Sequence, residues 1–212
     1  MQALLDLLNE EQRQVFTSFK TPADIQNFLD SIPYSPENRN RCPLNVIRDR
    51  QAHCLDGALF GAAALRWLGF PAQLIDMFPD PGMDDDHVLA IYRRGKYLGA
   101  VAKSNFSGLR FREAVYRTPR ELVLSYFEDF FNSDGVKTMR TYTPILDLSA
   151  LDDSHWMTTD AGADVVEKKL LKLRRFPVVT PEMAADFSMV DTRSFEAGML
   201  GVNKKGLYKP KK

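Results

Sequence analysis

Apolar residues dominate one stretch of the chain, 55–68, which contains only two charged side chains. A helix that is apolar on nearly every face lies in the interior of a protein, with other elements packed around it. Gly57 and Gly61 lower the helix propensity of this stretch, so we expect them where a neighbouring backbone or sheet comes close. Gly69, followed by Pro71, predicts the end of the helix. The pattern therefore predicts a buried central helix that begins near Cys54.

Amphipathic segments on both sides of this stretch predict further helices. Leucine and phenylalanine recur at helical spacing in residues 2–19, and Thr-Pro pairs at helix-start positions open three more segments. A capping box strengthens the second of these starts, because Glu121 follows Thr118 by three residues. The predicted helices outside the centre cover residues 2–19, 21–32, 118–131, 162–175 and a short segment from 180, while 43–50 is either a short helix or an extended approach to the cysteine.

Short runs rich in aliphatic residues predict an antiparallel sheet after the central helix. The strands are expected at residues 72–77, 87–92 and 97–105, with a hairpin turn at 93–96 and an added edge strand within 136–148. His87 then begins one strand and Asn105 ends its partner. In an antiparallel hairpin the start of one strand lies beside the end of the next, so these two residues should be neighbours.

Composition narrows the class of protein. The chain has 212 residues, 28 basic and 28 acidic, so its balanced charge predicts no nucleic-acid partner. No run reaches the roughly 18 apolar residues of a membrane span, and the N-terminus lacks the basic and apolar regions of a signal peptide. We therefore expect a cytoplasmic protein with its two cysteines reduced and no membrane partner. Neither zinc nor calcium-loop spacing occurs, so we expect no metal and no cofactor.

One domain with appendages suits a chain of this length. We assign residues 1–40 to an N-terminal helical segment packed on the core and residues 41–148 to the core itself. Residues 149–203 form a C-terminal helical extension of the same domain, and 204–212 a basic tail. The expected fold class is α+β, with the cysteine-bearing helix packed on the antiparallel sheet.

The candidate chemistry lies at the start of the central helix. A helix N-terminus favours a thiolate, which points to Cys54 as a nucleophile. His87 is expected to stabilise the thiolate and protonate the leaving amine, and Asn105 to orient the imidazole. Ser104 is the alternative third member. The backbone N–H of Cys54 is one candidate oxyanion donor and Gln51 a second.

The residues around this cysteine resemble the core of the transglutaminase-like superfamily. The resemblance rests on Arg50-Gln51-Ala52-His53-Cys54-Leu55-Asp56-Gly57-Ala58 and on the helix-to-strand turn Arg66-Trp67-Leu68-Gly69-Phe70-Pro71-Ala72. It covers about residues 45–110 and implies a papain-like α+β fold with cysteine-based acyl chemistry on an amide. The family has Asp at the third catalytic position, where this chain offers Ser104 and Asn105, and Asn serves that role in papain-like proteases.

Two hypotheses follow for the function. The first is a transglutaminase-like cysteine protease or amidase, a hydrolase or acyltransferase acting on a peptide, isopeptide or other amide bond of a peptide or protein substrate. The second is a catalytically inactive relative that binds a protein or peptide partner through the same cleft. A third reading, in which Cys54 is only a core residue, stays open at this point.

Overall fold

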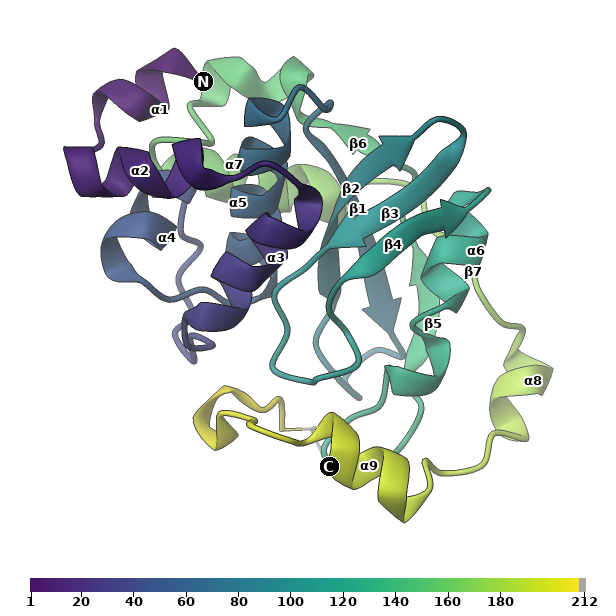
Figure 1. Ribbon diagram of the computed structural model, residues 1–212. Coiled ribbons are helices and arrows are strands. Elements are labelled where there is room, and N and C mark those ends of the chain that lie inside the picture. The colour runs from purple at the N-terminus through teal and green to yellow at the C-terminus, as the bar shows by residue number, and fades with distance from the viewer. Residues whose placement is uncertain (210–212) are drawn as a thin grey trace.

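The apolar stretch forms helix α5 (Cys54–Trp67), whose residues 55–65 are all buried. In the computed structural model, which describes residues 1–209, α5 lies against strand β2 (His87–Arg94) at the centre of the molecule (Figure 1). A Cβ at Gly57 would overlap the side chain of Lys103, and one at Gly61 would lie 3.0 Å from Ala90 Cβ. The expectation that both glycines mark close approaches is thus confirmed.

The sheet is antiparallel throughout, with the strand order β4-β3-β2-β1-β5-β7. Strand β6 also pairs with β1, at residues that β5 does not reach. Its described strands are β1 (Gln73–Pro79), β2, β3 (Tyr97–Val101), β4 (Arg112–Tyr116), β5 (Met139–Tyr142), β6 (Leu146–Asp147) and β7 (Phe176–Pro177). The fold class α+β is confirmed in this form. The segment predicted as an edge strand instead supplies β5 and β6, which pair with β1, while β7 lies at the edge.

Strand β3 ends at Val101, four residues earlier than predicted. The side-chain amide of Gln26 replaces the missing strand partner: its Nε2 donates to Ala102 O at 2.9 Å, and its Oε1 accepts from Ala102 N at 3.0 Å. Residues 102–105 therefore leave the sheet and turn toward the site. This detour places Asn105 in a loop rather than at a strand end.

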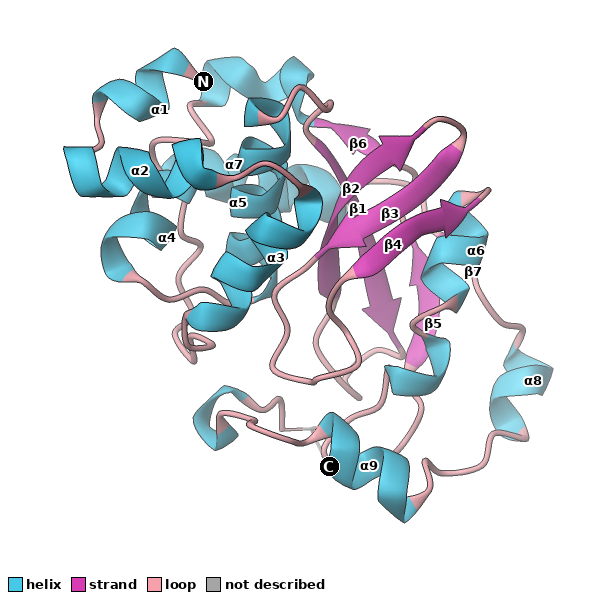
Figure 2. Ribbon diagram, in the orientation of Figure 1, coloured by secondary structure: helices cyan, strands magenta, loops and turns pink. Residues whose placement is uncertain are grey.

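Helices cover both faces of the sheet (Figures 1 and 2). The predicted helix 2–19 is two helices, because Asn9 caps a new start. Around α5 lie α1 (Gln2–Asp6), α2 (Glu10–Ser18), α3 (Pro22–Ser31), α4 (Pro43–Asp49) and α7 (Asp160–Leu171). Helix α6 (Pro119–Leu124) is shorter than predicted and packs on the opposite face with its aromatic neighbours.

The C-terminal region returns to the end of the sheet near Cys54. After α8 (Pro181–Ala185) and α9 (Thr192–Gly198), a 3₁₀ turn spans Lys204–Gly206 (Figure 1). Residues 204–209 thus lie against the protein, where a basic tail was expected, and 210–212 fall outside the described residues. None of the described helices combines the length and apolar character needed to cross a membrane.

Candidate active site

Cys54 is the first residue of α5, and the loop before it is held by a buried carboxylate. Asp56 accepts hydrogen bonds from His53 N at 3.1 Å and from Arg41 N at 2.6 Å. The Arg41 guanidinium is itself buried and pairs with Glu37 and Asp49. The Asp56 carboxylate caps the first turn of α5 and also binds the backbone of Arg41. The ion pairs of Arg41 therefore help to hold Cys54 in place relative to the sheet.

The thiol of Cys54 is half-buried and faces the loop before β2. Its Sγ donates to Asp86 O at 3.7 Å. Burial, followed by the charges of Asp86, Asp76 and Asp85, raises the pKa of Cys54 well above its ordinary value. This shift favours the neutral thiol and is opposite in direction to the one expected from the helix N-terminus alone. The positive end of α5 is outweighed by the carboxyls that face it.

His87 begins β2 as predicted and is 4% exposed. Its Nε2 lies 2.7 Å from Leu109 O. A carbonyl oxygen can only accept, so Nε2 carries the proton and Nδ1 is left as the acceptor of the neutral ring. Burial lowers the pKa of His87 to about 4, with Arg112 adding to the effect, so the imidazole is neutral near pH 7.

Asn105 has a different role from the one expected. Its Nδ2 donates to Asn203 O at 3.0 Å, and its Oδ1 accepts from Asn203 N at 2.8 Å. Both ends of the amide therefore clamp the C-terminal segment and are not free to orient His87. Leu109 O provides that orientation instead. This correction follows from the early end of β3, which turns Asn105 toward Asn203.

The remaining predicted residues are placed as follows. Cys54, His87, Ser104 and Asn105 line one small cavity of about 40 Å³. Ser104 Oγ accepts from Phe106 N at 3.0 Å, which makes it a turn residue. Gln51 lines neither this cavity nor the larger one beside it, and its Nε2 donates to Glu37 Oε1 at 3.4 Å. Among the described residues, Cys54 and His87 are neighbours across the small cavity without a direct hydrogen bond between them.

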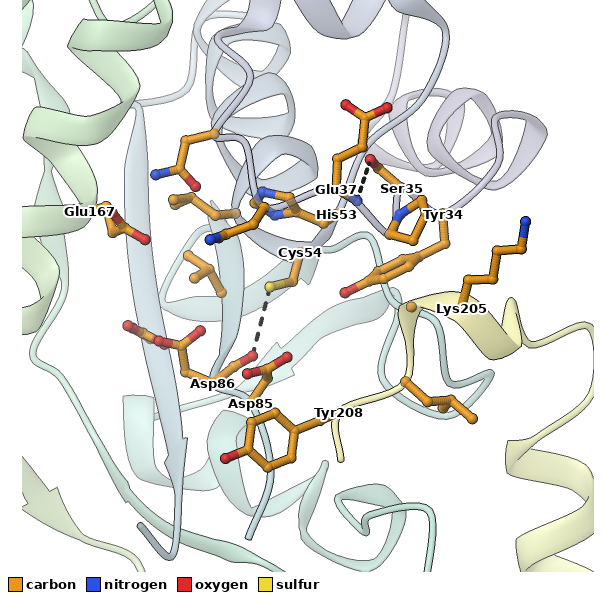
Figure 3. Close-up of a pocket in the computed structure, with 18 of the residues that line it drawn as sticks. Tyr34, Ser35, Glu37, His53, Cys54, Asp85, Asp86, Glu167, Lys205 and Tyr208 are labelled. Atoms are coloured by element: carbon orange, nitrogen blue, oxygen red, sulfur yellow. Dashed lines mark hydrogen bonds between the residues drawn. The ribbon is translucent and has the colours of Figure 1, made fainter. Parts of the chain in front are cut away.

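A larger cavity of about 410 Å³ also borders Cys54 (Figure 3). Tyr34 and His53 lie beside the cysteine, and Asp85 and Asp86 lie across from it. Tyr208, from the C-terminal segment, lines the same space (Figure 3). This volume falls within the range of small-molecule sites, so Cys54 lies between a narrow cavity with the imidazole and a wider one with room for substrate.

The C-terminal segment covers part of this opening. Asn203 Nδ2 donates to Tyr34 O at 3.0 Å, and Gly206 packs so closely that an added Cβ would lie 2.9 Å from the Tyr34 ring. The backbone of Tyr34 forms a bridge with Ala52, close before the cysteine. Together these contacts join the residues just before Cys54, the loop 33–35 and residues 203–206 into one wall of the larger cavity.

Sequence reasoning missed Leu109, Tyr34 and Asp76 as members of the site. The carbonyl of Leu109 carries no side-chain signal, and Tyr34 precedes the cysteine by 20 residues. Asp76 lies in the otherwise apolar strand segment Leu74-Ile75-Asp76-Met77. Burying a carboxylate is costly, so a charged residue in such a segment could have indicated a functional position. The described residues contain no group of three or more histidine, cysteine or acidic side chains arranged to hold a metal ion.

A scan against protein-family models and a search of curated proteins each found no match for the chain.

Proposed function

We propose that the protein is a cysteine-dependent hydrolase or acyltransferase that acts on an amide or ester bond of a peptide or protein substrate. One observation carries this proposal: Cys54, at the start of a helix, and His87, with Nδ1 as its free acceptor, line the same cavity. The α+β architecture with the cysteine helix against an antiparallel sheet supports a transglutaminase-like core. Two free cysteines support a cytoplasmic location, where thiols stay reduced.

The reaction begins from a neutral thiol and a neutral imidazole. As Cys54 Sγ attacks the carbonyl carbon, its proton passes to His87 Nδ1 and the S–C bond forms. The C–N bond then breaks, and the amine leaves with the proton from the imidazole. Water, or an acceptor amine, next adds to the thioester carbonyl, and the displaced sulfur regains a proton. The backbone N–H of Cys54, in the first turn of α5, is the donor that we assign to the oxyanion.

An active-site titration with p-nitrophenyl acetate tests this proposal. The background is Cys42→Ser, since Ser is a good N-cap at that position of α4 and leaves one thiol. We expect a burst of nitrophenol equal to one acyl group per chain, carried on Cys54. Cys54→Ala should abolish the burst, and His87→Asn should slow it by about 100-fold or more.

His155→Asn is the matched control. His155 is exposed and adopts a left-handed backbone conformation that Asn tolerates, so the burst should be unchanged. Because the reaction needs a neutral imidazole, the burst rate should fall as the pH falls through about 4. A folded protein that shows no acyl group on Cys54, or a burst that His87→Asn leaves intact, would refute the enzyme and favour a catalytically inactive domain that binds a peptide.

A further inference from the structure

One buried oxygen beside Cys54 has no partner. Among the side chains of the described residues, Asp76 Oδ1 is the buried polar atom that lacks a hydrogen bond. Asp76 lies on β1, is 1% exposed and lines the larger cavity. Leaving a buried acceptor unpaired costs about 1–3 kcal/mol, and more for a charged group. Since Asp76 lines a space large enough for a ligand, a partner for this oxygen can come from outside the chain.

Three more carboxyls line the same cavity, and we refer to Asp76, Asp85, Asp86 and Glu167 as the acidic floor. Asp86 and Glu167 both raise the pKa of Asp76, which burial has already raised. Arg175 opposes these effects, but it is exposed and lies over the Phe78 ring at 3.6 Å. Among the described residues that line this cavity, the four carboxyls of the acidic floor outnumber the two lysines, Lys205 and Lys209.

We propose that the acidic floor binds an ammonium or guanidinium group of the substrate, so that the substrate of this site carries a basic side chain close to its reacting carbonyl. The inference rests on the proposed function for the chemistry at Cys54. The Asp86 carbonyl accepts from Cys54 Sγ at 3.7 Å, which puts the floor next to the reacting sulfur. A buried carboxylate is stabilised by a charge-assisted hydrogen bond from such a cation.

The walls of the cavity suit the rest of a basic side chain. Leu55, Val88 and Leu170 line it above the floor, and Tyr34 adds an aromatic edge. Lysine and arginine bury their methylene stems along apolar walls while the charged head reaches a polar group. A bare metal ion fits less well, because the described residues hold no set of three metal-ligating side chains and the space of about 410 Å³ is far larger than an ion.

Binding of capped amino acids tests the subsite without any reaction. The probes are Nα-acetyl-lysinamide and Nα-acetyl-argininamide, with Nα-acetyl-norleucinamide as the neutral analogue, titrated at about pH 8 by protein-observed NMR. The protein is the full chain carrying Cys54→Ala, so no acyl transfer interferes. We expect at least one basic probe to bind about 10-fold more tightly than the neutral one, with shifts at the acidic floor.

Substitutions then locate the binding group. Asp76→Asn should remove most of the 10-fold preference, and Asp86→Asn should do the same, which keeps the test decisive if one variant fails to fold. Asp153→Asn, at an exposed site that lines neither cavity beside Cys54, should leave the preference unchanged. Equal binding of the three probes, or a preference that survives both substitutions, would overturn the inference and leave water as the partner of Asp76. Competition by Ca²⁺ or Mg²⁺ at the floor would overturn it in favour of a metal site.

The two proposals fail separately. A preference for basic probes without an acyl group on Cys54 refutes the enzyme and leaves the cation subsite standing. Acylation of Cys54 without any preference for basic probes refutes the subsite and leaves the enzyme standing.

Discussion

Asp56 and Asp76 are both buried close to Cys54, yet they lie in opposite surroundings. Asp56 is 0% exposed and receives hydrogen bonds from two backbone N–H groups, with Arg41 Nη1 at 3.7 Å. Asp76 is 1% exposed and has one oxygen without a partner. Burial raises the pKa of Asp56 to about 7, although its hydrogen bonds and Arg41 act to lower it. Burial also raises the pKa of Asp76, and the charge of Asp86 adds to that rise.

This difference separates a structural carboxyl from a functional one. The donors around Asp56 belong to the loop and helix start that hold Cys54, so the fold itself satisfies that group. The surroundings of Asp76 are a cavity and other carboxyls, so the fold leaves that group unsatisfied. A helix cap needs a paired acid, and a cation subsite needs an unpaired one. The same residue type therefore serves two purposes on two sides of one thiol.

The largest expected effect is on stability, at Asp56, the carboxyl whose oxygens are paired. Asp56→Asn exchanges an oxygen that accepts backbone hydrogen bonds for an NH₂ group and leaves the buried Arg41 with less charge to face. We expect a loss of about 3 kcal/mol in the free energy of unfolding, measured by urea denaturation near pH 7. Asp76→Asn measured in parallel should lose less than about 1 kcal/mol. An equal loss for both variants would break the comparison.

The second prediction concerns how stability depends on pH. Because the pKa of Asp76 is raised in the folded state, the folded protein holds more protons than the unfolded chain above about pH 4, and its stability falls as pH rises. The amide that Asp76→Asn introduces has no such titration. The free energy of unfolding of Asp76→Asn, minus that of the parent, should therefore be higher at pH 8 than at pH 5 by about 1 kcal/mol or more. Urea unfolding at both pH values measures this difference. The opposite sign, or no difference, would mean that Asp76 already has a stabilising partner.

The smallest effect is expected at Asn105, a paired side chain beside the open cavity. Asn105→Ala removes two hydrogen bonds to Asn203 and should cost about 1 kcal/mol locally, visible as faster hydrogen exchange of Asn203 N. The acylation rate of Cys54 should fall less than about 10-fold, since Leu109 O still orients His87. A loss of 100-fold or more in a folded variant would restore Asn105 to the catalytic role that sequence reasoning gave it.

Much of the fold could be predicted from the spacing of apolar residues and the positions of glycine and proline along the chain. The all-round apolar pattern after Cys54 predicted a central helix, and Gly57 and Gly61 predicted the contacts that Lys103 and Ala90 now explain. His87 was placed at a strand start because it opens a run rich in aliphatic residues. These features are local, so the sequence encodes them directly.

The errors arose where distant residues decide the outcome. Gln26 ends β3 through the backbone of Ala102, a contact across 76 positions that no local pattern contains. In the loop that follows, both ends of the Asn105 amide bond to Asn203 instead of to His87. Two arginines before Cys54 are held by ion pairs with acids that no local pattern connects to them: Arg41 is buried and pairs with Asp49, and Arg39 pairs with Asp49 and Asp160. Burial also gave Cys54 a raised pKa, where the helix N-terminus alone predicted a lowered one.

Carboxyl ¹³C NMR of Asp76, followed as a function of pH in the Cys54→Ala protein, tests the central contrast most directly. We predict a pKa of Asp76 well above the ordinary value of a free aspartate, and a marked fall in that pKa when Nα-acetyl-lysinamide or Nα-acetyl-argininamide is added. Asp56 should show no response to the same probes. An Asp76 that titrates near its ordinary value, or whose pKa the basic probes leave unchanged, would contradict the claim that its partner comes from the substrate.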